Sequence, residues 1–474
     1  MSEHPDLTNR IGEYYAILSP DKHDGEEICP DEFNVLNHDV LLLEQIGSGS
    51  INGEAYKSCI PYDKETKKCD NGILLSTKKI PLTQMQKFLY PYHQDKEELL
   101  NHENDAFVEL ACMQLCAHVI LNNEAICPNL PLYYNYFLCN RCDYRNPEIL
   151  KRNEYLTQKA ESAVYLDKKG KEVKQMFKTL KELLKYKNKT ILAGDDYKLM
   201  VQSAGQQIAD IYKHAINDAI SRSCILLINE FADGGDLKHW LKEDHSTLEW
   251  TVMYFHVFAG LYTLQKHFDL THHDLHWGNV LVHKIQPGGF LNYKIDNRYY
   301  RIPNIGYLFT LWDFGYAYVP GKMQARDISF YSKIHNRYGD DYFRISNAIY
   351  WNMKVDKATN KPNGTVPKRM EEFFDIISLL YTNNAPLKYV FEKAFKSFIS
   401  TEKLDVDYII DDKVVPKVPK SQQWLLNTNE NYKKVYPTSV EDFSGTHPEL
   451  YSELYSELYR TFGDSTVEAL LAHV

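Results

Sequence analysis

Apolar runs and apolar periodicity divide the chain into parts of different character. Short apolar runs at 40–46, 72–80 and 223–231 have the length of buried strands. The segments 104–119 and 250–268 instead carry apolar residues at the three- and four-residue spacing of a helix. We therefore expect strands in the first half, with one helix among them, and a largely helical region after the last long strand.

The most informative segment follows the second of these helices. Residues 271–282 read THHDLHWGNVLV, which places Asp274 and Asn279 on one loop in front of an apolar strand, and Asp313 follows in the letters DFG. One carboxylate can orient an acceptor hydroxyl and take its proton, while an amide and a second carboxylate hold Mg²⁺ on phosphates. We predict that Asp274 is the catalytic base and that Asn279 and Asp313 bind the metal. The alternative is a polar turn that Asp274 caps.

A glycine-rich turn, GSGSING over 47–53, separates the first apolar strand from a second strand at 54–57. Glycine lets a backbone approach phosphates closely, because no Cβ blocks the way. We predict that this turn covers the phosphates of ATP, although its third glycine comes one residue later than in G-x-G-x-x-G. An ordinary hairpin is the alternative. The residues assigned to the phosphate contact are Gly47, Ser48, Gly49 and Gly53.

Together these segments resemble the protein-kinase superfamily over roughly 40–380. The letters DLHWGNVL over 274–281 are closest to the catalytic loop of haspin-type Ser/Thr kinases. The stretch between this loop and the letters DFG is longer than in most kinases, and the segments 291–295 and 301–306 within it resemble the hairpin that haspin inserts there. Haspin itself lacks Asp-Phe-Gly, whereas this chain keeps it.

The resemblance implies an α+β, bilobal, protein-kinase-like fold with insertions. The small N-lobe would be an antiparallel sheet, and the C-lobe would be mostly helical. The implied organisation is an N-terminal extension at 1–38, an N-lobe and hinge at 39–232 with a lysine-rich helical insertion at about 140–222, a C-lobe at 233–400, and a C-terminal extension at 401–474 that packs on the C-lobe.

The strand at 72–80 contains two adjacent lysines, and only one of them can face a nucleotide. Side chains alternate along a strand, so Ser76 and Lys78 share one face. The resemblance places Ser76 near the adenine and Lys78 near the phosphates. Lys79 would then be a solvated strand lysine. The alternative exchanges the two lysines, because a shift of one residue reverses the faces.

The resemblance also requires a glutamate partner for Lys78 on the following helix. Glu109 lies on the predicted helix at 104–119 and precedes the letters LACM. We predict that the catalytic Lys78 pairs with Glu109. Glu98 and Glu103 are the alternatives, and we expect both to be solvated charges.

The apolar strand at 223–231 would correspond to the last strand before the hinge. By the resemblance, the backbone of Glu230, Phe231 and Ala232 binds adenine, and Asn229 gates the pocket behind it. The alternative is an ordinary turn between a strand and a helix.

Three departures from the kinase pattern concern regulation. His273 replaces the Arg that usually reads a phosphate on the activation segment, His276 replaces a usual Lys, and no Ala-Pro-Glu follows Asp-Phe-Gly. We therefore expect a nonstandard activation segment at 316–351 and an enzyme that is competent without phosphorylation. In the predicted helix at 371–377, Asp375 resembles the aspartate that braces the catalytic loop; a surface acid is the alternative.

Composition and charge limit the classes of partner. The formal net charge is −10, which argues against a general nucleic-acid binder. Mean hydropathy is −0.46, and no apolar run is long enough to span a bilayer. The start of the chain is polar and acidic, unlike a secretory signal. We expect an intracellular protein, cytoplasmic or nuclear, in a host cell or a virion, with no membrane partner.

The nine cysteines are dispersed and odd in number, which suggests a reduced setting. Cys139 and Cys142 form a C-x-x-C pair with Cys127 upstream, but a second close pair is absent. Structural zinc usually has four ligands, so a zinc site is the less favoured interpretation. Cys112 and Cys116 lie on a predicted apolar helix and are expected in the core.

Two further segments could contact partners. Residues 168–189 hold nine lysines against Glu172 and Glu182, either as a solvated helical face or as a docking surface for an acidic partner. Residues 448–459 repeat Leu, Tyr and Glu every four positions. We expect a helix that packs on the C-lobe; a partner-binding helix is the alternative.

Three functions compete. The favoured one is an ATP- and Mg²⁺-dependent kinase acting on Ser/Thr hydroxyls of a protein, since nothing resembles the tyrosine-kinase catalytic loop. The second is a small-molecule phosphotransferase of the aminoglycoside- or choline-kinase type, which shares His-x-Asp-Leu-His-x-Gly-Asn. The third is a catalytically weak scaffold or virion component. The Tyr, Asn and Lys content and the insertions resemble kinases encoded by large DNA viruses.

Overall fold

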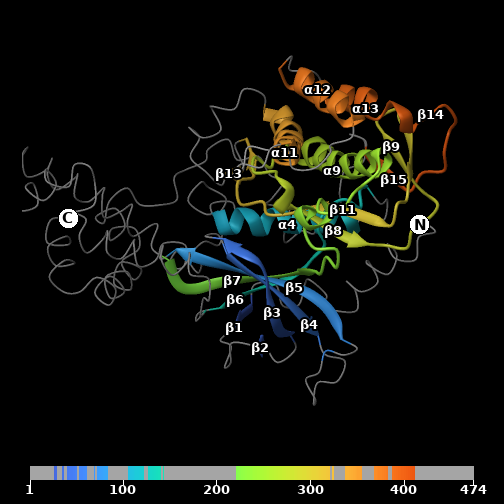
Figure 1. Cartoon of the computed structure of the whole chain (residues 1–474). Helices are drawn as coiled ribbons and strands as arrows, with labels where there is room; N and C mark the ends of the chain where they lie inside the picture. The colour runs from blue at the N-terminus through green and yellow to red at the C-terminus, as the bar shows by residue number, and fades with distance from the viewer. Residues whose placement is uncertain are drawn as a thin grey trace, which may run out of the picture.

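The structure, a computed structural model, consists of a large β-sheet and a helical region, with helix α4 (Asp105–Leu121) running between them (Figure 1). The described residues are 26–28, 35–36, 40–50, 53–60, 69, 72–83, 105–121, 126–139, 142, 220–320, 323–324, 337–354, 368–382 and 387–410. The predicted lysine-rich segment at 168–189 and the repeat at 448–459 lie outside these residues. The α+β prediction is confirmed.

The large sheet is built from strands of the first half of the chain. Its strands are β1 (Glu26–Ile28), β2 (Val35–Leu36), β3 (Val40–Ser50), β4 (Gly53–Ile60), β5 (Ile73–Thr83), β6 (Tyr133–Cys139) and β7 (Ile220–Glu230). They lie in the order β1-β6-β7-β5-β4-β3-β2. Neighbours are antiparallel except for β1 and β6, which are parallel. The predicted extension at 1–38 thus supplies both edge strands of the sheet.

The long connection between β6 and β7 lies where the insertion was predicted. These two strands are direct antiparallel neighbours, and Cys139 lies opposite Cys224. A tight hairpin could join them, yet residues 140–219 separate them along the chain. This arrangement accords with the predicted insertion at about 140–222.

Helix α4 is apolar on almost every side, which is typical of a helix buried on all faces. Every residue from Ala106 to Ala117 is buried. Cys112 and Cys116 lie in this core, as predicted, and burial raises the pKa of both thiols. The helix predicted at 104–119 is confirmed.

The helical region is organised around α9 (Thr247–Phe268). Ser246 begins this helix with a capping box to Glu249, and Asp269 ends it in the left-handed conformation, at φ 54°. The Phe255 ring packs edge-on against several aromatic rings, including those of Tyr293 and Phe391. The other helices are α8 (Leu237–Trp240), η3 (Trp277–Asn279), α11 (Arg337–Lys354), α12 (Lys368–Thr382), α13 (Leu387–Ala394) and η4 (Lys396–Phe398).

Three small sheets complete the described fold. The predicted long hairpin is present as β9 (Phe290–Ile295) and β10 (Arg298–Pro303), although its second strand begins three residues earlier than expected. The first strand after the catalytic loop, β8 (Val280–Lys284), pairs with β11 (Tyr307–Leu311). The remaining strands are β12 (Tyr318–Val319), β13 (Met323–Gln324), β14 (Ile399–Ser400) and β15 (Tyr408–Ile410).

The chain after residue 400 returns to the hairpin. Strand β15 pairs in parallel with β9, and β14 pairs with β10, so the hairpin becomes a four-stranded sheet. Residues 408–410 therefore pack on the helical region, and the packing of the predicted extension at 401–474 as a whole stays a prediction. Within the described residues, no helix is both long and apolar enough to cross a membrane.

The predicted activation segment is too long. We expected a nonstandard segment over 316–351, but residues 337–354 form helix α11, which contacts α9 and α12. Tyr342 and Ile345 of this helix are buried, so this part of the helix belongs to the core. The absence of Ala-Pro-Glu led us to extend the predicted activation segment over this helix. The signal for the helix is the apolar spacing of Tyr342, Ile345 and Ile349.

Candidate active site

Lys78 is held between two carboxylates. Its strand β5 lies between β4 and β7, with Ala55 and Leu227 on either side of the lysine. The Lys78 Nζ lies 2.5 Å from Glu109 Oε1 on α4 and 3.1 Å from Asp313 Oδ1. The structure therefore brings together three residues that were predicted separately.

The pKa shifts of Lys78 and Asp313 both favour the ionised side chain. Burial lowers the pKa of Lys78, but the Asp313 and Glu109 carboxylates outweigh it and raise the pKa above its usual range. Burial raises the pKa of Asp313, but the Lys78 ammonium outweighs it and lowers the pKa. Asp313 is 21% exposed, so one carboxylate of the triad can still reach a ligand.

The neighbours of Lys78 on β5 lie as the alternation predicts, with one correction. Ser76 is buried opposite Asn229. Lys79 was expected to be solvated, yet its side chain is buried and its Nζ lies 4.9 Å from the centroid of the Tyr56 ring. The reason is that β5 is an interior strand of the sheet and that other side chains also cover the face that carries Lys79. One of them is Tyr56, whose ring lies beside the Lys79 ammonium.

The glycine-rich turn forms the predicted hairpin between β3 and β4. The register shifts between Ile46 and Ser50, a stretch that includes Ser48 and Gly49. Gly47 adopts φ +73° with open space around it. A Cβ on Gly53 would lie 2.6 Å from the Lys79 carbonyl oxygen. Close packing of β4 on β5 is thus enough to require Gly53, whereas Gly47 has room for a ligand.

The predicted hinge is fixed to the rest of the protein through Glu230. Its backbone N–H donates to the Leu132 carbonyl at 3.0 Å, and its carboxylate accepts from the Leu132 N–H at 2.9 Å. The Phe231 ring lies 5.2 Å from Lys57 Nζ, and Ala232 is buried. These contacts hold Glu230 by its side chain and define the path of the hinge.

Asn229, the predicted gate, is fully buried. Its Nδ2 donates to the Leu227 carbonyl at 3.3 Å. Its Oδ1 is buried and has no hydrogen-bond partner among the residues that the structure describes. A buried acceptor without a donor costs free energy, so this oxygen is suited to receive an N–H from a bound ligand.

The predicted catalytic loop carries Asp274 and Asn279, and Asp313 follows β11, close enough for its charge to act on Asp274. Asn279 Nδ2 donates to the Asp274 carbonyl at 2.8 Å, which fixes the turn between them. The Trp312 N–H donates to the Asn279 carbonyl at 2.9 Å, where the ladder of β8 and β11 ends. Asp313 comes next in the sequence, with a left-handed φ of 61°.

His272 joins the catalytic loop to the strand that carries Asp313. Its Nε2 lies 2.8 Å from the Trp312 carbonyl oxygen, to which it donates. Its ring centroid lies 4.9 Å from that of Phe314, which is fully buried. Phe314 therefore has a structural role directly after Asp313, the candidate metal ligand.

The aspartate that braces the catalytic loop is Asp341, and the prediction of Asp375 is wrong. Asp341 on α11 accepts from the backbone N–H groups of His272 at 2.8 Å and His273 at 2.7 Å. Asp375 lies on α12 and is exposed. The brace is needed because His273 has a left-handed φ of 61°, which a non-glycine residue adopts only when its surroundings enforce it.

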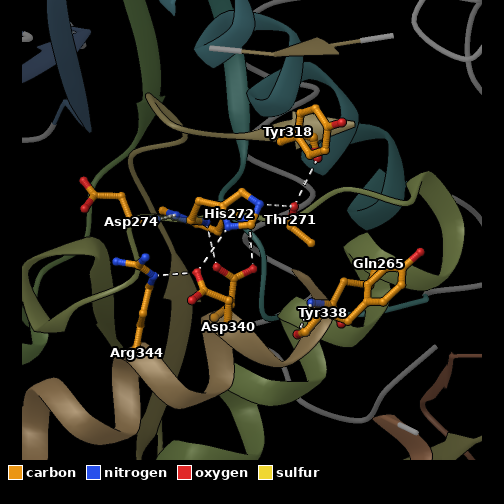
Figure 2. A network of polar contacts seen from close by, with 10 residues as sticks. Gln265, Thr271, His272, Asp274, Tyr318, Tyr338, Asp340 and Arg344 are labelled. Carbon is orange, nitrogen blue, oxygen red and sulfur yellow. Dashed lines mark hydrogen bonds and ion pairs between the residues drawn. The ribbon is translucent and has the colours of Figure 1, made fainter. Parts of the chain in front are cut away.

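His273, which replaces the usual phosphate-reading Arg, is enclosed by other residues of the protein. Its side chain is buried, with Nε2 2.7 Å from Thr271 Oγ1 and Nδ1 3.2 Å from Asp340 Oδ2. Thr271 is also tied to the Tyr318 carbonyl at 3.3 Å, as Figure 2 shows. The histidine therefore serves as an internal connector between the loop and α11.

Arg344 is a site residue that the sequence interpretation missed. Its Nε donates to Asp340 Oδ2 at 2.5 Å, and its side chain is 41% exposed. Figure 2 shows its guanidinium facing Asp340 with Asp274 beside it, and the charges of Arg344 and Asp274 interact. The signal that could have found it is an Arg one helical turn after an Asp pair.

The surroundings of Asp274 raise the pKa of its carboxyl group. Burial raises the pKa of Asp274, and His272, His276 and Arg344 lower it in part. His276 is exposed, and its Nδ1 accepts from the Gly278 N–H at 3.0 Å. The loop thus surrounds one carboxylate with three basic side chains.

Two comparisons place this geometry among known proteins. Residues 156–307 match the family described as protein tyrosine and serine/threonine kinase, a range that includes Asp274 and Asn279. A protein of Acanthamoeba polyphaga mimivirus named as a putative serine/threonine-protein kinase is 29% identical over 133 residues, which are 25% of this chain and 28% of that relative. The chain therefore spans little more than a quarter of the relative it matches. The chain has a protein-kinase-like fold, and these matches support its place in the protein-kinase superfamily.

Proposed function

We propose that this protein is an ATP- and Mg²⁺-dependent kinase that phosphorylates Ser or Thr hydroxyls of a protein substrate. The observation that carries the proposal is the Lys78 ammonium in contact with both Glu109 and Asp313. A scaffold has no need for a buried ammonium between two carboxylates, because buried charges cost free energy unless they serve each other or a ligand.

The residues present fit a nucleotide and a hard metal ion. Mg²⁺ prefers oxygen ligands, and the Asp313 carboxylate and the Asn279 amide would hold it. The ion would neutralise phosphate charge during transfer. Lys78 would contact the phosphates, Gly47 leaves open space at the glycine-rich turn, and the buried Asn229 Oδ1 offers an acceptor behind the hinge.

Asp274 would position the acceptor hydroxyl and accept its proton. As the hydroxyl oxygen forms its bond to the γ-phosphorus, the bond from that phosphorus to the bridging oxygen of ADP breaks. The hydroxyl proton goes to the Asp274 carboxylate, from which solvent removes it. Arg344, beside Asp274, would supply positive charge where negative charge gathers on the transferring group.

The choice of Ser/Thr hydroxyls rests on the catalytic-loop letters and on the printed name of the viral relative. The matched family description covers tyrosine kinases as well. The haspin likeness rests on DLHWGNVL and on the β9–β10 hairpin. We also propose, from the mimivirus relative and the composition, that the chain is encoded by a large DNA virus and acts inside a cell.

A transfer assay tests the proposal. Full-length protein is incubated with radiolabelled ATP and Mg²⁺, together with a panel of Ser-, Thr- and Tyr-containing proteins and a panel of small aminoalcohols and aminoglycosides. We expect label on Ser or Thr of a protein, and none with an Asp274→Asn variant. Label on a small alcohol would establish the phosphotransferase alternative. ATP binding without transfer to either panel would establish the scaffold alternative.

A further inference from the structure

Three cysteines converge at one end of the large sheet. Cys139 ends β6, Cys142 follows it in a C-x-x-C pair, and Cys224 lies opposite Cys139 on β7. All three side chains are buried. Their Sγ atoms lie within 4.8 Å of one another. The structure joins Cys142 and Cys224 as a disulfide, which uses only two of the three sulfurs.

We propose that, in the reduced protein, Cys139, Cys142 and Cys224 bind a Zn²⁺ ion. A C-x-x-C pair together with a thiol from a neighbouring strand is a frequent way of assembling a structural zinc site. Tetrahedral zinc with bonds of about 2.3 Å separates its sulfurs by about 3.8 Å. This separation lies within the span of the cluster, so small side-chain rotations are enough to bind the ion once the disulfide is open.

Burial of the three sulfur atoms is the physical reason why bound Zn²⁺ should be more stable than three neighbouring thiols. A buried thiolate is costly in isolation, but a divalent cation compensates the charge of several thiolates at once. Zn²⁺ binding replaces one proton on each thiol and releases these protons to solvent, so no oxidant or reductant takes part. The disulfide and the metal site are thus alternative states of the same sulfurs, and a reduced setting favours the metal.

Structural zinc usually has four ligands, and three of them would be the described cysteines.

The position of the cluster indicates its purpose. Cys142 begins the connection that returns to the sheet at Ile220, and Cys224 lies near the start of β7. A zinc ion at this point would link the chain just after β6 to β7, and so would hold together the two ends of the predicted insertion. The site is independent of the proposed phosphotransfer, because none of its residues contacts Lys78, Asp274 or Asp313 in the contacts that the structure describes.

The test uses the full chain purified under reducing conditions without chelator. After dialysis against ZnCl₂ and removal of free metal, elemental analysis should give one zinc per chain. Single variants Cys139→Ser, Cys142→Ser and Cys224→Ser should lose most of it. The double variant Cys59→Ser/Cys69→Ser is the matched control, because it removes the other disulfide of the described residues and should retain the zinc.

A second measurement guards against variants that fail to fold. Wild-type protein loaded with Co²⁺ in place of Zn²⁺ should show the intense near-ultraviolet absorption of thiolate-to-cobalt charge transfer, with a strength that reports at least three thiolates. Wild-type protein that takes up neither metal under reducing conditions would overturn the proposal. Stoichiometric zinc in a folded Cys142→Ser/Cys224→Ser variant would overturn it as well.

Discussion

Two halves of the candidate site hold their charged groups in different ways. On the sheet side, Lys78, Glu109 and Asp313 contact one another through side chains only. On the loop side, Asp341 binds backbone N–H groups. A buried carboxylate that loses its cation can take up a proton, whereas buried N–H groups that lose their acceptor have no such compensation. Replacements on the sheet side should therefore disturb folding less than replacement of Asp341 on the loop side.

The largest expected effect is on turnover when Asp274 is replaced. Asp274→Asn removes the proton acceptor while it keeps the size of the side chain. We expect turnover to fall by about 10²–10⁴-fold, the range typical of general base catalysis, with little change in ATP affinity. Steady-state kinetics and nucleotide titration would measure both. Near-normal turnover would show that the base lies elsewhere.

Replacement of each of the two lysines of β5 tests the sheet side of the candidate site. Lys78→Met should remove most activity and also lower the free energy of unfolding, because the buried Glu109 loses the cation that pairs with it. Lys79→Met should keep nucleotide binding but change the melting temperature, since Lys79 is buried against Tyr56. Thermal denaturation with and without ATP separates the two effects. The opposite assignment of the two lysines would follow if ATP stabilised the Lys78 variant and not the Lys79 variant.

On the loop side, the Asp341→Ala variant should lose stability together with activity. It leaves two buried N–H groups without an acceptor, at about 1–3 kcal/mol each. Chemical denaturation should give a free energy of unfolding lower by about 2–5 kcal/mol. Asp375→Ala is the matched control, because this exposed aspartate should be neutral for both properties. Equal behaviour of the two variants would contradict the assignment of the brace.

Arg344 should have a smaller effect, visible in the pH profile. Burial raises the pKa of Asp274 and Arg344 lowers it in part, so Arg344→Met should raise it further. The base must be ionised, and the acid side of the turnover profile should therefore move to higher pH. Both proteins carry the same nucleotide and metal, so their difference isolates the arginine. An unchanged profile would place Arg344 outside the electrostatics of the base.

The smallest expected effect is that of dephosphorylation. His273 is buried between Thr271 and Asp340, and α11 begins at Arg337 within the predicted activation segment. We expect phosphatase-treated protein to work at the rate of untreated protein. A large loss that an upstream kinase restores would show that a phosphate reaches the loop by another route.

The sequence predicted the parts of the site that depend on local pattern. Strand alternation assigned Lys78 and Ser76 to one face, and motif spacing identified Asp274, Asn279 and Asp313. It did not predict the brace, because Asp341 and Arg344 reach the loop only in the tertiary fold, where α11 packs on both α9 and η3. It also misjudged Lys79, since burial on the second face of a strand depends on what the tertiary fold places there. Contacts between segments that are far apart along the chain produce no periodic pattern of apolar residues in the sequence.

The return of the chain to the β9–β10 hairpin has a consequence for how the protein acquires its fold. The hairpin strands are adjacent in sequence and can pair early, but the edge of β9 remains open until Tyr408–Ile410 has been synthesised. An open edge strand is a template for pairing with other chains. Tyr293 on β9 also donates to Asn129 Oδ1 at 2.8 Å, so the same strand contacts the loop before β6. During translation the edge of β9 therefore stays open while more than a hundred further residues are synthesised. Aggregation through this edge is possible until residue 410 has left the ribosome and β15 has paired with β9.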